Sequence, residues 1–167
     1  MKLRLVTRAI FFTLLMPGTV TVLIPYSILG SPTVVHELSV LHIGACIIGL
    51  TGGGVLLYCI WGFAFLGGGT LAPVDPPKIL VVRGLYRYTR NPMYHSVLFI
   101  LLSTSLFFRN WGLLLYAGIV FGCFHLFVVL YEEPHLRKQF GHQYLEYCRA
   151  APRWGVSFRS FNNGEGR

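Results

Sequence analysis

Charged residues are scarce in this sequence, and acidic ones are the scarcest. Only 12% of the 167 residues are charged, with 6 Asp and Glu against 14 Lys and Arg, whereas about 25% is usual for a soluble domain. This argues against an ordinary soluble globule, and the length excludes most enzymes that carry a separate cofactor-binding domain. The net charge of +8 suits nucleic acid, an anionic lipid surface or a membrane orientation signal.

Several chemical signatures are missing as well. The four cysteines have no CxxC spacing, which is typical of small apolar residues in a helix bundle and not of a disulfide framework or a zinc site. No HxxxH pair occurs, so we expect no metal site. We expect His95 and His125 to face each other in structural hydrogen bonds, and His42 to be solvated on the outer side. Neither a GxxxxGK phosphate loop nor a Ser–His–Asp constellation is present.

Long apolar runs stand where charge is missing. Residues 9–29, 42–66, 93–108 and 111–131 contain no Asp, Glu, Lys or Arg. Three of the runs reach the roughly 20 residues that a membrane crossing needs, and the third spans about 25 Å if it begins at Pro92. We therefore predict an all-α, polytopic membrane protein with one domain over residues 1–167 and transmembrane helices at 9–29, 42–66, 92–108 and 111–131.

The basic residues fall on one side of this topology. With both termini cytoplasmic, 13 of the 14 Lys and Arg lie on the inner side, and Arg109 alone lies in an outer turn. That distribution follows the positive-inside rule and predicts a multi-pass protein, placed in the inner membrane if the chain is bacterial. The sequence offers no soluble basic face interleaved with aromatic residues, so we expect no nucleic-acid partner.

Small residues recur at four-residue intervals in two of the predicted helices. Ala45, Gly49 and Gly53 follow this spacing in the second helix, and Gly118 and Gly122 follow it in the fourth. Small residues let helix backbones approach closely in a membrane, so we expect both faces to pack inside the bundle.

The inner loop over residues 67–91 is rich in glycine and proline. Three prolines within five residues, at 73, 76 and 77, exclude a regular helix there, while the preceding glycines permit close backbone approach to a ligand. Asn91 followed by Pro92 is a favourable N-cap and first-turn pair, which predicts that the third helix starts there.

The segment after the fourth apolar run has helical periodicity. Apolar residues share one face over residues 132–148, which predicts an amphipathic helix on the cytoplasmic side, and residues 156–167 are expected to form a loose tail. That apolar face consists of Leu136, Phe140, Tyr144 and Tyr147. Glu132 and Glu133 begin this segment at the membrane boundary, where ionisable groups are either functional or simply solvated and paired with arginines.

A set of spaced motifs resembles the isoprenylcysteine carboxyl methyltransferase and phospholipid methyltransferase group of integral membrane enzymes. The likeness covers about residues 62–155 and rests on a glycine loop, an Arg-Asn-Pro-x-Tyr motif, a pair of glutamates and a Pro-Arg-Trp triplet. These are Gly67, Gly69 and Thr70, then Arg90, Asn91, Pro92 and Tyr94, then Glu132 and Glu133, and then residues 152–154. The resemblance implies S-adenosylmethionine, bound at the cytoplasmic side by the first three motifs. Isoprenylcysteine enzymes usually have Arg-His-Pro, so Asn91 bears on the acceptor more than on the cofactor.

The chemistry of the residues agrees with this donor. Free N–H groups near Pro92, with Arg90, suit its carboxylate, and Glu132 or Glu133 suits its ammonium or ribose hydroxyls. Tyr86, Tyr88 and Tyr94 are candidates to surround the sulfonium or adenine. Our candidate catalytic residues are Glu133 as a base for an amine or phenol acceptor, and Arg137, which either orients an acidic headgroup or merely snorkels.

The function predicted is S-adenosylmethionine-dependent methyl transfer to a lipophilic acceptor, such as an isoprenylcysteine-like carboxylate or a lipid amine, at the cytoplasmic face. One alternative is a membrane reductase with a nicotinamide cofactor, because sterol reductases have a similar Arg-x-Pro-x-Tyr pattern. The other is a non-enzymatic helical subunit of a larger complex, with the glycine faces as its interfaces.

Overall fold

A computed structural model describes residues 17–30, 39–66, 80 and 82–158. Helices dominate this part of the chain and no strand occurs in it, which confirms the all-α fold class. In chain order the elements are η1 (Thr19–Leu23), α2 (Ile24–Leu29), α3 (Val40–Leu66), η2 (Gly84–Arg87), α4 (Pro92–Phe107), α5 (Trp111–Phe127), η3 (Val128–Glu132) and α6 (Glu133–Ala150). The segments η1 and η3 are π-helical, and η2 is a 3-10 turn.

Two of the helical stretches are long and apolar enough to cross a membrane. They are Val40–Gly62 in α3 and the continuous run Trp111–Ala150, which begins with α5. The 16 residues of α4 reach only about 24 Å, less than the roughly 30 Å of a hydrocarbon core. Residues 9–16 of the first expected crossing lie outside the described residues, and Thr19–Leu29 is a shorter apolar helix. Four crossings therefore stay a prediction.

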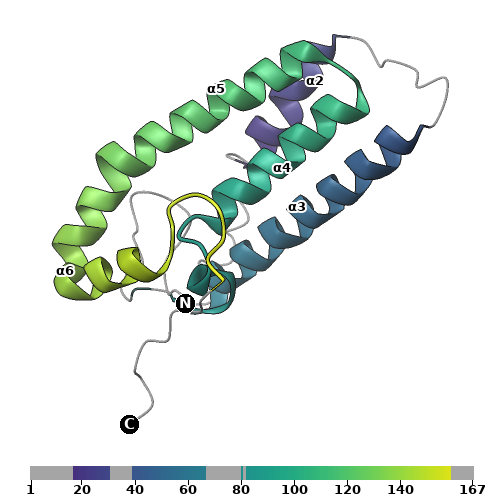
Figure 1. Cartoon of the computed structure of the whole chain (residues 1–167). Helices are drawn as coiled ribbons and strands as arrows, with labels where there is room; N and C mark the ends of the chain where they lie inside the picture. Colours follow the sequence, from purple (N-terminus) through teal and green to yellow (C-terminus); the bar gives the residue numbers. More distant parts are fainter. Residues whose placement is uncertain (1–16, 31–38, 67–79, 81, 159–167) are drawn as a thin grey trace.

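The long helices run side by side (Figure 1). Helix α4 lies between α3 and α5, and α2 packs near the start of α5. A tight turn at Arg109 and Asn110 reverses the chain between α4 and α5, and the Asn110 side chain caps α5 by accepting a hydrogen bond from the Leu113 N–H at 3.1 Å. Below, the inner end means the end at which α4 begins and α5 finishes, the side predicted to be cytoplasmic.

Small residues bring α3 and α4 into close backbone contact. The Ser103 hydroxyl on α4 donates a hydrogen bond of 2.7 Å to the Ala45 carbonyl on α3. A Cβ atom at Gly49 would lie 2.5 Å from the Ser103 hydroxyl oxygen, and one at Gly52 would lie 2.9 Å from the Ser96 carbonyl oxygen. The small face of α3 therefore packs inside the bundle as expected.

The expected packing of the other glycines is wrong. A Cβ atom at Gly53, Gly118 or Gly122 would meet none of the described residues within 4 Å. Gly52, one position earlier on the helix, takes the contact that the four-residue spacing assigned to Gly53. The expectation for His42 is wrong too, because this ring is buried at the outer end, where it contacts Phe107 edge-on and binds Ser39.

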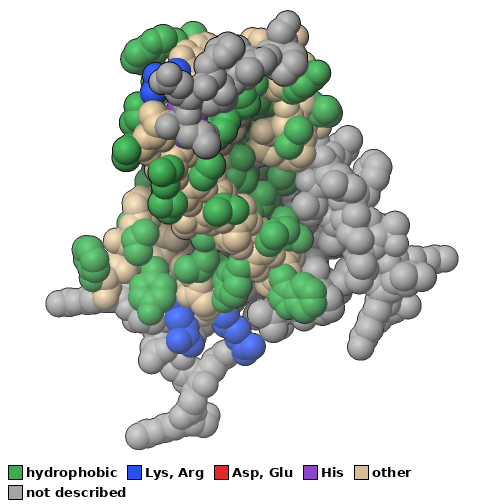
Figure 2. Space-filling model, turned by 90° about the vertical axis from the view of Figure 1, so that its right-hand side faces the viewer, with side chains coloured by type: hydrophobic (Ala, Val, Ile, Leu, Met, Phe, Trp, Pro, Cys, Tyr) green, Lys and Arg blue, Asp and Glu red, His purple; other side chains and the backbone are tan. Residues whose placement is uncertain are grey.

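The apolar core and the apolar surface both fit a membrane protein. Leu56, Val97, Leu101, Ala117 and Val120 form the central cluster between α3, α4 and α5. Large apolar side chains are exposed along α3 and α5. Figure 2 shows such side chains spread over one face of the molecule, with Lys and Arg gathered towards its ends. In water this surface would be costly, whereas lipid solvates it.

The expected amphipathic helix forms as α6, with a break inside it. Gly141 has φ 51° and ψ −123°, a conformation that favours glycine. The break redirects the chain so that Tyr144 and Tyr147 pack against Val82 and Ala151, with Leu136 and Phe140 at the margin. The predicted apolar face is therefore the buried one. Residues 156–158 have no regular structure, and the rest of the expected tail lies outside the described residues.

Candidate functional site

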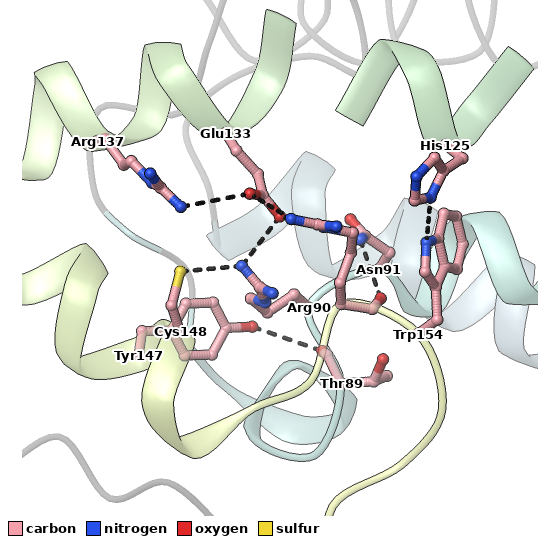
Figure 3. A network of polar contacts seen from close by, with 10 residues as sticks. Thr89, Arg90, Asn91, His125, Glu133, Arg137, Tyr147, Cys148 and Trp154 are labelled. Atoms are coloured by element: carbon pink, nitrogen blue, oxygen red, sulfur yellow. Dashed lines mark hydrogen bonds and ion pairs between the residues drawn. The ribbon is translucent and has the colours of Figure 1, made fainter. Parts of the chain in front are cut away.

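Polar contacts concentrate at the inner end, where the start of α4 meets α6 and the segment that follows α6 (Figure 3). We call residues 151–157 the strap. Two backbone hydrogen bonds attach it to the residues before α4: the Arg90 N–H donates to the Pro152 carbonyl at 3.0 Å, and the Ser157 N–H donates to the Tyr88 carbonyl at 2.8 Å. The strap therefore lies directly over the start of α4.

Glu133 is held by arginines from three segments. Arg90 donates to its Oε1 at 3.0 Å, and Arg153 donates through Nε to Oε1 at 2.5 Å and through Nη2 to Oε2 at 2.9 Å. Arg137, one turn along α6, has its Nη2 3.7 Å from Oε2. The Glu133 side chain is only 6% exposed, so this carboxylate links the start of α4, α6 and the strap.

These arginines determine the protonation of Glu133. Burial alone would raise the pKa of its carboxyl, but the hydrogen bond from Arg153 and the charges of Arg90, Arg153 and Arg137 lower it below its usual value. The same contact raises the pKa of the Arg153 guanidinium. A carboxylate so fully paired is a weak proton acceptor, which argues against the role of base that the sequence suggested for Glu133.

Glu132 is its neighbour in sequence but has a different environment. Its Oε2 accepts a hydrogen bond of 3.0 Å from the Tyr94 hydroxyl on α4, and the Tyr94 ring lies 4.7 Å from the ring of Phe124 on α5. Within the described ranges, no ion pair involves Glu132. The site thus contains one carboxylate that is neutralised by arginine and one that faces tyrosine.

The three candidate tyrosines lie in different environments. Tyr94 contacts Glu132, as described. The Tyr86 hydroxyl hydrogen bonds to the Cys59 thiol on α3, and its pKa is raised by burial, by Cys59 and by the nearby charge of Glu132. Tyr88 is exposed. Tyr86 and Tyr94 therefore lie near the same carboxylate, whereas Tyr88 lies at the surface.

Helix α4 starts at Pro92, as predicted, with Asn91 in the N-cap position. The Asn91 side chain makes no cap hydrogen bond. Its Nδ2 instead donates to the Arg153 carbonyl at 3.1 Å. Asn91 therefore fixes the strap and leaves the first backbone N–H groups of α4 without a side-chain cap.

Two polar atoms at the same place are buried without a partner. Thr89 Oγ1 and Arg90 Nε have no hydrogen-bond partner among the described residues. By contrast, Arg90 Nη1 contacts both Glu133 and the Cys148 sulfur, the latter at 2.9 Å. Buried polar atoms without partners are uncommon in folded proteins.

The sequence reasoning missed the strap as a structural part of the site. The motif that contains Arg153 did not indicate its contact with Glu133. His95 and His125, which we expected to face each other, instead contact Trp154. The Trp154 indole N–H donates to His125 Nδ1 at 2.9 Å, and the Gly155 N–H donates to His95 Nε2 at 3.1 Å. The Pro-Arg-Trp triplet at residues 152–154, just after the amphipathic helix, was the available signal. The glycine-loop candidates Gly67, Gly69 and Thr70 lie outside the described residues.

One comparison with known proteins gives a match. Residues 71–143 match the model of the family described as Phospholipid methyltransferase. This range includes the start of α4, all of α5 and both glutamates, and it excludes the strap. No curated protein and no solved structure matches the chain significantly. The family match confirms the resemblance drawn from the motifs and supports a membrane methyltransferase.

Proposed function

Because residues 71–143 carry the phospholipid methyltransferase match, we propose that this membrane protein transfers a methyl group from S-adenosylmethionine to a lipophilic acceptor at its inner end. The observation that carries the proposal is Glu132, a carboxylate within the bundle that accepts a hydrogen bond from Tyr94 and forms no ion pair in the described part of the chain. A negative group beside aromatic rings is a suitable place for a cation.

The residues present fit charged groups of both signs in this donor. Glu132, with Tyr94 and Tyr86 nearby, suits a sulfonium or an ammonium group, and cation–π attraction contributes about 0.5–2 kcal/mol. Thr89 Oγ1 and Arg90 Nε, which have no hydrogen-bond partner in the described part of the chain, suit a carboxylate or a hydroxyl, together with the backbone N–H groups of the first turn of α4. When bound, the sulfonium supplies an electrophilic methyl group.

The contribution of the chain is chiefly positional. Displacement at a methyl carbon depends on holding donor and acceptor in line and on excluding water. Glu133 fixes Arg90 and Arg153 and thereby the start of α4, while Glu132 is the carboxylate that remains to take a proton if the acceptor is an amine. Arg137 is 56% exposed and suits an anionic headgroup at the surface.

Ligand titration of the detergent-solubilised protein tests the donor. We expect saturable binding of S-adenosylmethionine and none of NADPH. Glu132→Gln is expected to weaken donor binding at least about tenfold, because a hydrogen bond to a charged group is worth about 1.5–3 kcal/mol. Glu146→Gln is the matched control, since Glu146 is an exposed glutamate on α6 that pairs only with His142 among the described contacts. Binding of NADPH alone would indicate the reductase, and binding of neither ligand would contradict both enzymatic functions.

A labelling experiment on membranes that contain the protein identifies the methyl acceptor. Incubation with methyl-labelled donor, extraction and separation of the products are expected to give a labelled lipid or lipidated thiol that membranes without the protein do not give. Label found only in water-soluble products would contradict a lipophilic acceptor while leaving donor binding intact.

A further inference from the structure

Trp154 occupies the inner end of the space between α4 and α5. Its ring centroid lies 5.4 Å from that of His95 on α4, 6.2 Å from that of His125 on α5 and 5.0 Å from that of Phe121. In Figure 3 the indole points up from the strap and its N–H faces His125. The strap is thus attached to both helices through a single aromatic side chain and its neighbour Gly155.

The hydrogen bonds require both histidines to be neutral. An indole nitrogen and a backbone N–H only donate, so His125 Nδ1 and His95 Nε2 must each accept with a lone pair. The other nitrogen of His95 then carries the proton and donates to the Asn91 carbonyl at 2.7 Å. Adding a proton to either accepting nitrogen would place one N–H against another.

We propose that Trp154 is a positioning residue that latches the strap over the start of α4 when His95 and His125 are neutral, and that protonation of the histidines releases it. Release also loosens the contacts that the strap makes next to Trp154. The Arg153 carbonyl accepts from Asn91, and the Arg153 guanidinium binds Glu133. The latch thereby reaches the start of α4 through two contacts of Arg153.

The charged groups around the histidines have partners of their own. Arg90 and Arg153 bind Glu133, and Glu132 accepts from Tyr94. In the described ranges, no carboxylate forms an ion pair with His95 or His125. The titratable and charged groups that the described contacts place at the start of α4 and the strap are Arg90, Tyr94, Glu132, Glu133 and Arg153. No ion pair in the described ranges therefore offsets the loss of the two hydrogen bonds on protonation.

Tryptophan fluorescence tests the latch without any methyl transfer. In a Trp61→Phe/Trp111→Phe background, Trp154 is the remaining tryptophan of the three. We expect its emission to shift to the red as the pH falls from about 8 to about 5, the range in which imidazole takes a proton. In the same background, His95→Gln with His125→Asn keeps an accepting oxygen in place of each ring nitrogen, and the shift is expected to disappear.

Two controls separate the latch from general effects of acid. His142→Gln removes a histidine that is 82% exposed on α6, and the shift is expected to persist. Circular dichroism is expected to show the same helix content at both ends of the titration. The proposal is overturned if Trp154 shows no shift, if the shift survives the double histidine replacement, or if it coincides with loss of helix.

A second arm rests on the proposed function, because it measures donor affinity. The wild type is expected to bind S-adenosylmethionine about fivefold more weakly at pH 5.5 than at pH 7.5, within the usual range of coupling between sites. Trp154→Phe keeps an aromatic ring but has no N–H donor. It is expected to bind weakly at both pH values, and the double histidine variant is expected to show a smaller pH dependence of binding than the wild type. Failure of donor binding with an intact fluorescence shift would refute the proposed donor and leave the latch, whereas wild-type affinity and pH dependence in Trp154→Phe would refute the positioning role.

Discussion

The two ends of the bundle are stabilised by different means. Towards the outer end, α3 and α4 approach through Ala45, Gly49 and Gly52, and the contact is made of backbone, small side chains and one serine hydroxyl. At the inner end, long charged side chains join segments up to 63 residues apart, from Arg90 to Arg153, through Glu133. The α3–α4 contact is stabilised by close packing of small residues, and the inner end is stabilised by the charge of the Glu133 carboxylate. The described part of this membrane protein therefore separates a close-packed helix contact from a buried cluster of charged side chains.

The carboxylate of Glu133 is the most consequential single group at the inner end. Glu133→Ala leaves the guanidinium groups of Arg90 and Arg153 without their carboxylate. We expect the free energy of unfolding to fall by about 3–5 kcal/mol, the usual effect of removing one partner from a buried ion pair. Unfolding in mixed micelles with increasing SDS measures the change, and Glu146→Ala on the exposed face of α6 is its control. Equal stability of the two variants would show that the arginines are solvated without Glu133.

Shape rather than charge is tested at the α3–α4 contact. Gly52→Val would bring a Cβ atom within 2.9 Å of the Ser96 carbonyl oxygen and 3.0 Å of the Phe99 Cβ. We expect the free energy of unfolding to fall by about 1–3 kcal/mol through overpacking. Gly53→Val is a close control, because a Cβ atom there would meet none of the described residues within 4 Å. Equal effects of the two substitutions in the same SDS titration would mean that α3 and α4 do not pack through Gly52.

A smaller effect is expected from the hydroxyl that joins α6 to the residues before α4. Tyr147 donates to the Tyr86 carbonyl at 2.6 Å. Tyr147→Phe keeps the ring in its cluster and removes this bond, so we expect a loss of about 1 kcal/mol. The matched replacement Tyr26→Phe on α2 alters an exposed ring and is expected to change nothing in the same measurement. A loss equal to that of Glu133→Ala would mean that the ring itself is displaced.

The helices were predictable because each follows from its own residues. Apolar runs and the Asn91–Pro92 pair define α3, α4 and α5 to within two residues at their starts, since membrane helices are determined by local hydropathy and capping. The choice between Gly52 and Gly53 was not predictable, because adjacent helix positions differ by about 100° in direction and no residue pattern states where the neighbouring helix lies.

The sequence predicted which residues gather at the site, but it did not predict which partners each of them contacts. Glu132 and Glu133 are equivalent in the sequence, yet the helix directs one towards Tyr94 and the other towards three arginines. The strap was missed for a related reason. Two of its bonds to the residues before α4 run through the Pro152 and Arg153 carbonyls. Backbone groups are identical at every position of a sequence, so no motif reveals which of them are used.

Arg137 is an exposed arginine that approaches Glu133, so replacing it compares the effect of a surface charge with that of the buried charges in this cluster. It approaches the same Oε2 as Arg153, but at 3.7 Å and with 56% of its side chain exposed. We expect Arg137→Ala to lower the free energy of unfolding by at most about 1 kcal/mol, since water and salt screen an exposed pair. If Arg137 orients an anionic headgroup, the variant has a higher KM for the lipid acceptor at unchanged donor affinity. An unchanged KM would mean that the Arg137 side chain only snorkels to the surface. A stability loss as large as that of Glu133→Ala would mean that the exposed and buried arginines contribute equally to the Glu133 cluster.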